Sequence, residues 1–513
     1  MHSLTRQKWM KLTSFVVAFG VAGTAVLAGP IDEPHLNILP RTDAEAGRVA
    51  AATALTTDFS KPGAFEENSA GAATVRARSN ADAFSQPSGN ISFEGELNFK
   101  VGNGLFRKLW VSSPSSTLAS DGLGPVYNAR SCQRCHLKDG RGHPPETADD
   151  SAVSMFLRIS IPGDAADGIA EIEDYIATRP DPTYGSQMQD FGIAGHGAEY
   201  RMQIDYEEIE VELSDGQVTH LRAPTYTAAD LGYGPLHPEA MLSPRIAPQM
   251  IGLGLIEAIR AGDILASADP DDVDGDGISG RPNIVWSVEF EQPMLGRFGL
   301  KAGAPTVRQQ SAGAFAGDIG ISNPLFPGGW GECTETQAKC RAAPHGDGDD
   351  RIEEIDMVGL DLVTFYSRNL GVPARRGVGD AEVLHGKKVF YETGCTSCHT
   401  PSYVTHRLKD QDEQSFQLIW PYSDFLLHDM GEGLADGRPE ARATGYEWRT
   451  PPLWGVGLTE LVSNHSYFLH DGRARSLLEA ILWHGGEAEA MKQSVIAMPR
   501  PDRDALIRFL ESL

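Results

Sequence analysis

The 513-residue sequence is poor in three things: cysteine, positive charge and long apolar runs. Lysine and arginine number 44 against 70 aspartate and glutamate residues, so the formal net charge is −26. Binding of nucleic acid requires a basic patch for phosphate, and this charge balance argues against that class. After the first 28 residues no apolar stretch is long enough to cross a bilayer, which excludes a multi-span membrane protein. With 41% hydrophobic and 22% charged residues, the composition is that of a globular chain and excludes a mainly disordered one.

The N-terminus has the layout of a secretory signal. Three basic residues precede an apolar run from Leu12 to Ala28, and Val26 and Ala28 occupy the −3 and −1 positions of a small-residue cleavage site. The sequence therefore predicts a signal peptide over residues 1–28 and export to the periplasm. An uncleaved membrane anchor is the alternative that this run leaves open.

Shifts in composition divide the rest of the chain. Residues 29–90 are rich in Ala, Ser, Thr, Asp and Glu and are expected to form an arm of extended chain or short helices. Two globular blocks are expected at 91–375 and 376–513, the first with an insertion at about 150–295.

Local patterns predict a few elements within these blocks. Alternating apolar residues between Glu199 and Arg222, with a turn at Asp215-Gly216, predict a β-hairpin. Helical periodicity predicts short helices over Ile251–Ala261 and Met357–Asn369.

Four of the six cysteines lie in two copies of the pattern Cys-x-x-Cys-His. On one helical turn, positions i, i+3 and i+4 share a face, so two thiols can form thioethers with haem vinyl groups while the histidine reaches the iron. The pattern is typical of c-type haem attachment. The residues are Cys132, Cys135 and His136 in the first copy, and Cys395, Cys398 and His399 in the second. The sequence therefore predicts two covalently attached haem c groups with His136 and His399 as iron ligands.

A weak duplication supports two haem units. Gly104 and Phe106 precede the first motif, and Gly386 and Phe390 precede the second. We expect an early helix in each unit, with a small residue near an aromatic one. A zinc knuckle would need four converging ligands, and a redox cysteine pair would not need the histidine.

Cys333 and Cys340 are the remaining cysteines, in a loop rich in Gly and Pro. In an oxidising compartment this spacing predicts a local disulfide. A catalytic dithiol is the alternative reading.

Several longer segments resemble a known family. The matching segments are Trp448-Arg-Thr-Pro-Pro-Leu453, Tyr467-Phe-Leu-His470-Asp-Gly472, Phe298-Gly-Leu-Lys-Ala-Gly303, Gln309-Gln-Ser-Ala-Gly313, Asp424-Phe-Leu-Leu-His-Asp-Met-Gly and Leu482-Trp-His-Gly-Gly-Glu487. As a set they resemble the di-haem oxidoreductases, often labelled thiol oxidoreductases, which are relatives of the bacterial di-haem cytochrome c peroxidases. The resemblance implies a mainly α fold of two cytochrome c-like haem domains with long loops and a small β-hairpin insertion. One haem would handle the substrate and the other would pass electrons.

His484 is the expected sixth ligand of the second haem. Ser476 and Glu479 form a capping box that starts a helix, and His484 shares its apolar face with Leu477 and Ile481. In the peroxidases this helix carries the sixth ligand, commonly Met, and the resemblance places His484 there. A buried core histidine is the alternative role, and the chain then offers two methionines as ligands. These are Met430 and Met491.

The first haem has a less complete signal. The segment from Gln310 to Gly320 resembles the distal pocket of the peroxidases, where a Gln orients peroxide and a Glu moves its protons. The Glu position falls on Gly320, and Asp318 is the nearest acid, so efficient cleavage of peroxide is open to question. Gln310 and Asp318 are the candidate catalytic residues. His143 and His196 are alternative caps for this iron, although each is expected to be a surface or loop histidine.

An acidic loop resembles the opening of a calcium-binding loop. Asp272, Asp274 and Asp276 alternate before Gly277, but Asn283 stands where the twelfth-position Glu is expected. The sequence leaves a calcium site and a solvated acidic turn equally open.

These observations predict a peroxidase-like oxidoreductase. Electrons would enter at the His399 haem and reach the His136 haem, which would reduce peroxide or oxidise a thiol or protein substrate. The expected partner is a small electron-donor protein or a quinone-linked donor, and a homodimer is left open. The alternative is a non-catalytic di-haem electron-transfer cytochrome.

Overall fold

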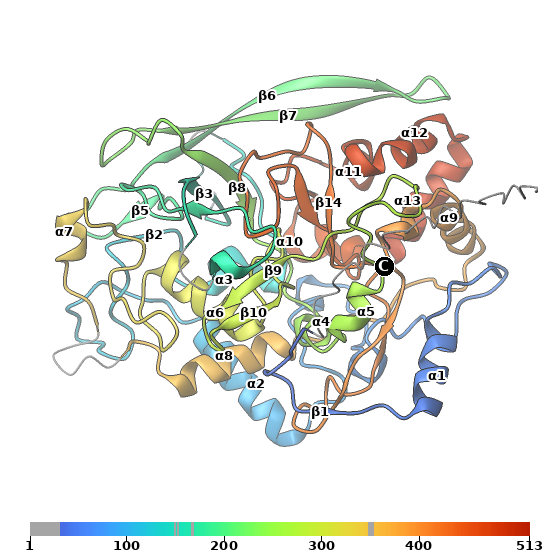
Figure 1. Ribbon diagram of the computed structural model, residues 1–513, viewed down its shortest axis with the longest axis horizontal. Coiled ribbons are helices and arrows are strands. Elements are labelled where there is room, and N and C mark those ends of the chain that lie inside the picture. Colours follow the sequence, from blue (N-terminus) through green and yellow to red (C-terminus); the bar gives the residue numbers. More distant parts are fainter. Residues whose placement is uncertain (1–30, 148–149, 151–152, 166–168, 347–352) are drawn as a thin grey trace, which may run out of the picture.

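The computed structural model describes residues 31–147, 150, 153–165, 169–346 and 353–513 (Figure 1). The predicted signal peptide, residues 1–28, lies outside the described residues. The helices are α1 Asp43–Thr53, α2 Phe93–Phe106, α3 Cys132–Cys135, α4 Leu253–Glu257, α5 Ala261–Leu265, α6 Val307–Ala314, α7 Ala338–Arg341, α8 Met357–Arg368, α9 Ala381–Glu392, α10 Thr459–Ser463, α11 Leu477–Leu482, α12 Glu489–Ala497 and α13 Arg500–Ser512. Among the helices of these residues, none is both long and apolar enough to cross a bilayer.

The strands are mostly short. They are β1 Ile38–Leu39, β2 Val126–Tyr127, β3 Met155–Pro162, β4 Thr178–Arg179, β5 Phe191–Gly192, β6 Arg201–Glu212, β7 Val218–Ala229, β8 Met241–Ile246, β9 Ile284–Ser287, β10 Gln292–Leu295, β11 Tyr403–Val404, β12 Arg407–Leu408, β13 Leu418–Ile419, β14 Leu427–Asp429 and β15 Glu447–Arg449. They form several small antiparallel sheets, of which β4-β3-β8 has three strands.

The predicted fold class, mainly α with two cytochrome c-like domains, is wrong. The structure is only 29% helix and 17% strand, and its described residues form 13 helices and several small sheets. One missed strand had a readable pattern, because the alternating residues Met155, Leu157 and Ile159 of β3 are all buried. Two-residue strands such as β1 have no local signal, since Ile38 pairs with Leu408 far along the chain.

The predicted helices are largely confirmed. Met357–Asn369 corresponds to α8, whereas Ile251–Ala261 contains α4 and ends where α5 begins. A Cβ at Gly102 of α2 would collide with the carbonyl oxygen of Leu362 in α8, and Gly386 of α9 meets Ala505 of α13 in the same way. Each Cys motif is therefore preceded by a helix that crosses another helix at a glycine. In the first unit this glycine is Gly102; a Cβ at the predicted Gly104 would meet nothing within 4 Å.

The predicted hairpin is confirmed, and it is longer than expected. Strands β6 and β7 pair from Arg201–Ala229 to Glu212–Val218, and Figure 1 shows them lying across one face of the molecule toward α11 and α12. At the tip, the Ser214 amide donates to Ile496 and Arg503 forms an ion pair with Asp215 at 2.8 Å.

Leucines of the hairpin enter the core. Leu213 and Leu221 are buried against Trp448, Phe468 and Trp483. A segment from the first half of the chain therefore packs over residues of the second half.

The predicted arm, residues 29–90, also packs into this shared structure. Glu66 is buried between Arg375 and Lys387, and the hydroxyl of Tyr422 donates to Glu66 at 2.8 Å. Phe84 belongs to the largest apolar core together with residues from both blocks. The predicted domain boundaries stay predictions.

Candidate functional site

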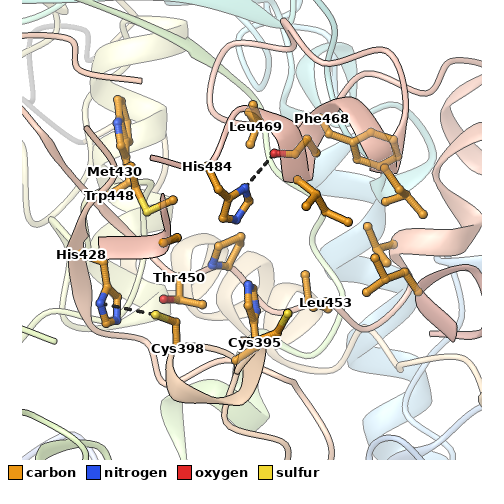
Figure 2. Close-up of a pocket in the computed structure, with 18 of the residues that line it drawn as sticks. Cys395, Cys398, His428, Met430, Trp448, Thr450, Leu453, Phe468, Leu469 and His484 are labelled. Atoms are coloured by element: carbon orange, nitrogen blue, oxygen red, sulfur yellow. Dashed lines mark hydrogen bonds between the residues drawn. The ribbon is translucent and has the colours of Figure 1, made fainter. Parts of the chain in front are cut away.

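The second Cys motif lies on the wall of a cavity of about 240 Å³. Cys395, Cys398 and His399 line it, and most of the other lining side chains are apolar. They include Met430, Trp448, Leu453, Phe468, Ile481 and Leu510. Figure 2 shows Cys395 and Cys398 on one side of this cavity and His484 across from them. The motif therefore faces a space that suits a flat, mainly apolar group.

A hydrogen bond to the backbone fixes one ring nitrogen of His399. Its Nδ1 lies 2.9 Å from the carbonyl oxygen of Tyr422, so Nδ1–H donates there and Nε2 is left for a metal. Burial lowers the pKa of His399 to about 4, which keeps the imidazole neutral. The ring of Phe390 in α9 lies 6.0 Å away. Neutral imidazole with a free Nε2 is the form that binds iron.

His484 has the same arrangement on the other wall. Its Nδ1 lies 2.7 Å from the carbonyl oxygen of Ala480, and burial lowers the pKa of His484 (Figure 2). The helix start is confirmed, because Ser476 caps α11 by accepting from the Glu479 amide. The predicted alternatives Met430 and Met491 line the same cavity. The structure therefore brings all three candidate sixth ligands to one place.

The first Cys motif repeats this pattern. Helix α3 carries both thiols, and Nδ1 of His136 lies 2.8 Å from the carbonyl oxygen of Pro248. Burial lowers the pKa of His136 to about 4. Phe106 at the end of α2 has its ring 6.3 Å from that of His136. His136 is thus also neutral, with Nε2 left for a metal.

Two consecutive residues connect the surroundings of the two Cys motifs. Pro248 receives the His136 hydrogen bond, and the next residue, Gln249, lines the second cavity. Gln249 also donates to the carbonyl of Trp454 at 2.7 Å. The surroundings of the two histidines therefore adjoin each other.

The structure separates the two predicted catalytic residues. Asp318 follows α6 in a turn of π-helix and accepts from the side chain of Gln187 at 2.7 Å. Its desolvation raises the pKa of Asp318, and its charge raises the pKa of the nearby Cys132 and Cys135 thiols. Gln310 is exposed. Asp318 is therefore placed beside the first motif.

A second acid beside the first motif was missed. Asp190 accepts from Asn128 at 3.1 Å, and desolvation raises the pKa of Asp190 to about 8. Asp190 also raises the pKa of Cys135 through its charge. Asp190 has no local sequence signal, because Asn128, which donates to it, and Asp318, which joins the same hydrogen-bonded group through Gln187, come from distant segments.

His143 and His196 lie in loops. The ring of His143 contacts that of His465 at 5.3 Å. His196 is half-buried, and burial and the charge of Lys339 lower its pKa.

A buried histidine beside the second motif was also missed. His428 hydrogen-bonds Asp424 at 2.8 Å and Glu487 at 2.6 Å, and its Nδ1 lies 3.6 Å from the Cys398 sulfur. Burial alone would lower the pKa of His428, but these partners outweigh it and raise the pKa well above its usual value. The available signal was its place in the resembling segment that starts at Asp424.

The acidic loop differs in detail from the prediction. Oxygen atoms of Asp269, Asp272 and Asp274 lie within 4.8 Å of one another, and Asp276 is not part of this group. Asn283 is committed elsewhere, since it donates to the carbonyls of Lys301 and Glu440. Calcium binding stays a prediction.

The remaining cysteines, Cys333 and Cys340, are buried, and their sulfur atoms lie 1.99 Å apart. This is the distance expected for the predicted disulfide.

A family model described as "di-haem oxidoreductase, putative peroxidase" matches residues 64–513. The chain belongs to this family. The match covers most of the chain, including both Cys motifs and His484. No curated protein matches the chain.

A di-haem oxidoreductase needs two places for haem, and the described residues fit that need. Each place offers two cysteines and a neutral histidine whose Nδ1 is fixed by a backbone carbonyl. This hydrogen bond leaves Nε2 available to bind the haem iron. The second place adds a mainly apolar cavity with His484 opposite the motif. The residues that would hold the groups are Cys132, Cys135, His136, Cys395, Cys398, His399 and His484.

Proposed function

We propose that the chain is an exported c-type di-haem oxidoreductase that acts on peroxide. Cys132 and Cys135 would attach one haem and Cys395 and Cys398 the other, each through thioether bonds. The observation that carries the proposal is the repeated histidine arrangement. His136 and His399 are both half-buried and fixed through Nδ1 by a carbonyl oxygen, and desolvation lowers the pKa of each to about 4.

The two places are suited to different roles. Bound haem supplies a one-electron redox centre and, at an open coordination position, a site for peroxide. At the second place His399 and His484 would both hold the haem iron, which suits electron transfer. At the first place Asp318 can hold a proton beside the motif, and Gln187 orients its carboxyl.

The short link between the places supports exchange of electrons between them. The Pro248 carbonyl fixes His136, and Gln249 reaches the second cavity. We expect a small electron-donor protein or a quinone-linked donor to serve the second place. A thiol or protein group is the alternative substrate at the first.

Haem content tests the attachment. The exported protein should carry two haems in a pyridine-haemochrome assay, and Cys132→Ala and Cys395→Ala should each remove one. Gln133→Ala, inside the first motif but not a ligand, is the matched control and should keep both. Two haems after either cysteine substitution would refute the assignment.

Spectroscopy and turnover test the activity. The half-reduced protein should show a high-spin, five-coordinate component by optical and EPR spectra and should consume peroxide. A protein with two haems that stays fully low-spin and does not react with peroxide would be an electron-transfer cytochrome instead.

A further inference from the structure

Arg141 is a half-buried cation that forms no ion pair with the described residues. It follows the first Cys motif by a few residues, yet its side chain lines the cavity of the second motif. One Nη donates to the carbonyl of Leu469 at 2.7 Å, and the buried Nε has no hydrogen-bond partner. Burial lowers the pKa of Arg141 to about 10, and no nearby acid opposes this shift.

Arg449 lines the same cavity in a similar state. Its guanidinium donates at 3.0 Å to the carbonyls of Gly299 and Thr450, and it forms no ion pair with the described residues. Burial lowers the pKa of Arg449 to about 10, with Asp424 as the one acid that opposes the shift. Both guanidinium groups are therefore charged and partly desolvated, and their hydrogen bonds within the described residues go to carbonyl oxygens; Arg449 also lies 5.9 Å from the ring of Phe425.

Buried arginines elsewhere in the described residues have the carboxylate partner that Arg141 and Arg449 lack. Several of them are paired with a carboxylate within 4 Å: Arg245 with Glu440, Arg297 with Glu33, Arg375 with Glu66, Arg473 with Asp471 and Arg503 with Asp215. Burying a charge without a partner costs several kcal/mol, roughly the whole value of a good ion pair. Two such charges lining one cavity indicate that the cavity receives an anion.

We infer that Arg141 and Arg449 bind the two propionate carboxylates of the haem held at the second motif. The inference rests on the proposed function, because it requires a haem there. Guanidinium groups match carboxylates through paired N–H donors, and one haem carries two propionates. Haem vinyl and propionate groups lie on different halves of the macrocycle. Figure 2 shows Leu469, whose carbonyl accepts from Arg141, across the cavity from Cys395 and Cys398, whereas Thr450, whose carbonyl accepts from Arg449, lies near Cys398.

Arg141 then connects the two motifs. Its backbone belongs to the loop after His136, and its side chain would fix the edge of the second haem. A change of charge at the second haem would therefore act on the loop that follows the first Cys motif.

The test compares Arg141→Gln and Arg449→Gln with wild type in the purified holoprotein. Each substitution removes one positive charge beside the second haem, which favours the oxidised form, so its reduction potential in a redox titration should fall. The propionate-bending bands in the resonance Raman spectrum should shift, because they report hydrogen bonds to the propionates. Arg141→Lys should restore most of the potential while leaving the band shifted, since Lys keeps the charge without the paired donors.

Arg442→Gln is the control. Arg442 donates to the Glu173 carbonyl and is not among the residues that line the cavity. In this variant the reduction potential of the second haem and its propionate-bending bands should match those of wild type.

The outcomes separate the two proposals. A wild-type chain without the second haem contradicts the proposed function itself. Two haems, with potential and bands unchanged in both Gln variants, would overturn the propionate assignment alone. A shift that appears only when phosphate is added would mean that the arginines bind a free anion, which also overturns it. If Arg141→Gln does not fold, Arg449→Gln and Arg141→Lys still test whether the arginines bind the propionates.

Discussion

Glu66 is expected to be the most sensitive single position outside the haem motifs. Its carboxylate is 1% exposed and contacts both Arg375 and Lys387, with the latter at 2.7 Å. It also accepts from the Tyr422 hydroxyl, and the Tyr422 carbonyl fixes His399. Glu66→Gln would leave the buried cations Arg375 and Lys387 without their counter-charge. They lie next to Tyr422, the residue that orients a haem ligand.

The expected cost follows from this geometry. Removing one partner of a buried ion pair typically costs about 3–5 kcal/mol, and a folded domain has only about 5–15 kcal/mol in total. Burial alone would raise the pKa of Glu66, but Arg375 and Lys387 outweigh it and hold the pKa below its usual value. Because the folded-state pKa is lowered, this stabilisation is present at neutral pH and is lost as the pH falls below about 4.3, the pKa of an unfolded glutamate.

Urea unfolding followed by circular dichroism measures this cost, and haem absorbance reports the second site in the same experiment. The neighbouring Glu67 is exposed, so Glu67→Gln should change the unfolding free energy by less than about 0.5 kcal/mol. Adding Lys387→Met to Glu66→Gln removes one stranded cation and should recover part of the loss. A Glu66→Gln protein within 1 kcal/mol of wild type, roughly the error expected of such reasoning, would refute this account.

Three other changes test the candidate sites. His484→Met should raise the reduction potential of the second haem and keep it low-spin, because thioether ligation raises haem potentials relative to a second imidazole; redox titration measures this. Asp318→Ala should slow peroxide reduction without changing haem content, because its carboxyl is held beside the first motif; stopped-flow absorbance measures this. Asp190→Asn should stabilise the protein at pH 8 but not at pH 4. Desolvation raises the pKa of Asp190 to about 8, so wild type loses stability as pH rises from about 4 through that value; urea unfolding at both pH values measures this.

Each of these has a clear opposite result. An unchanged potential in His484→Met would move the sixth ligand to Met430 or Met491. Peroxide turnover at the wild-type rate in Asp318→Ala would remove Asp318 from the mechanism. Equal effects of Asp190→Asn at both pH values would mean that the carboxyl titrates normally.

The sequence revealed what depends on short spacing. The Cys motifs, the helix start at Ser476 and the hairpin turn at Asp215-Gly216 are local, so periodicity and turn chemistry were enough. His484 was predicted because the resemblance counts it from the nearby segment Tyr467–Gly472, and the helix start puts it on an apolar face. The resemblance overestimated helix, because it implied two small helical haem domains, and strands such as β3 were overlooked.

What was missed depends on segments far apart in the chain. Arg141 meets Leu469 across 328 positions, and Glu66 meets Tyr422 across 356. No pattern near Arg141 shows that it lines the cavity of the other motif. Similarly, Asp190 is significant only because folding places it near Cys135.

The hairpin β6–β7 has a kinetic consequence. Its tip docks on the end of the chain, where Ser214 contacts Met498 across 284 positions, and contacts of such separation form slowly. Until they form, Leu213 and Leu221 cannot cover the apolar residues beside the second cavity. Once the fold is complete, burial raises the pKa of the Cys395 thiol to about 12, and a thiol held in its protonated form is a poor nucleophile. Attachment of haem at Cys395 would therefore be favoured before the fold around this thiol is complete.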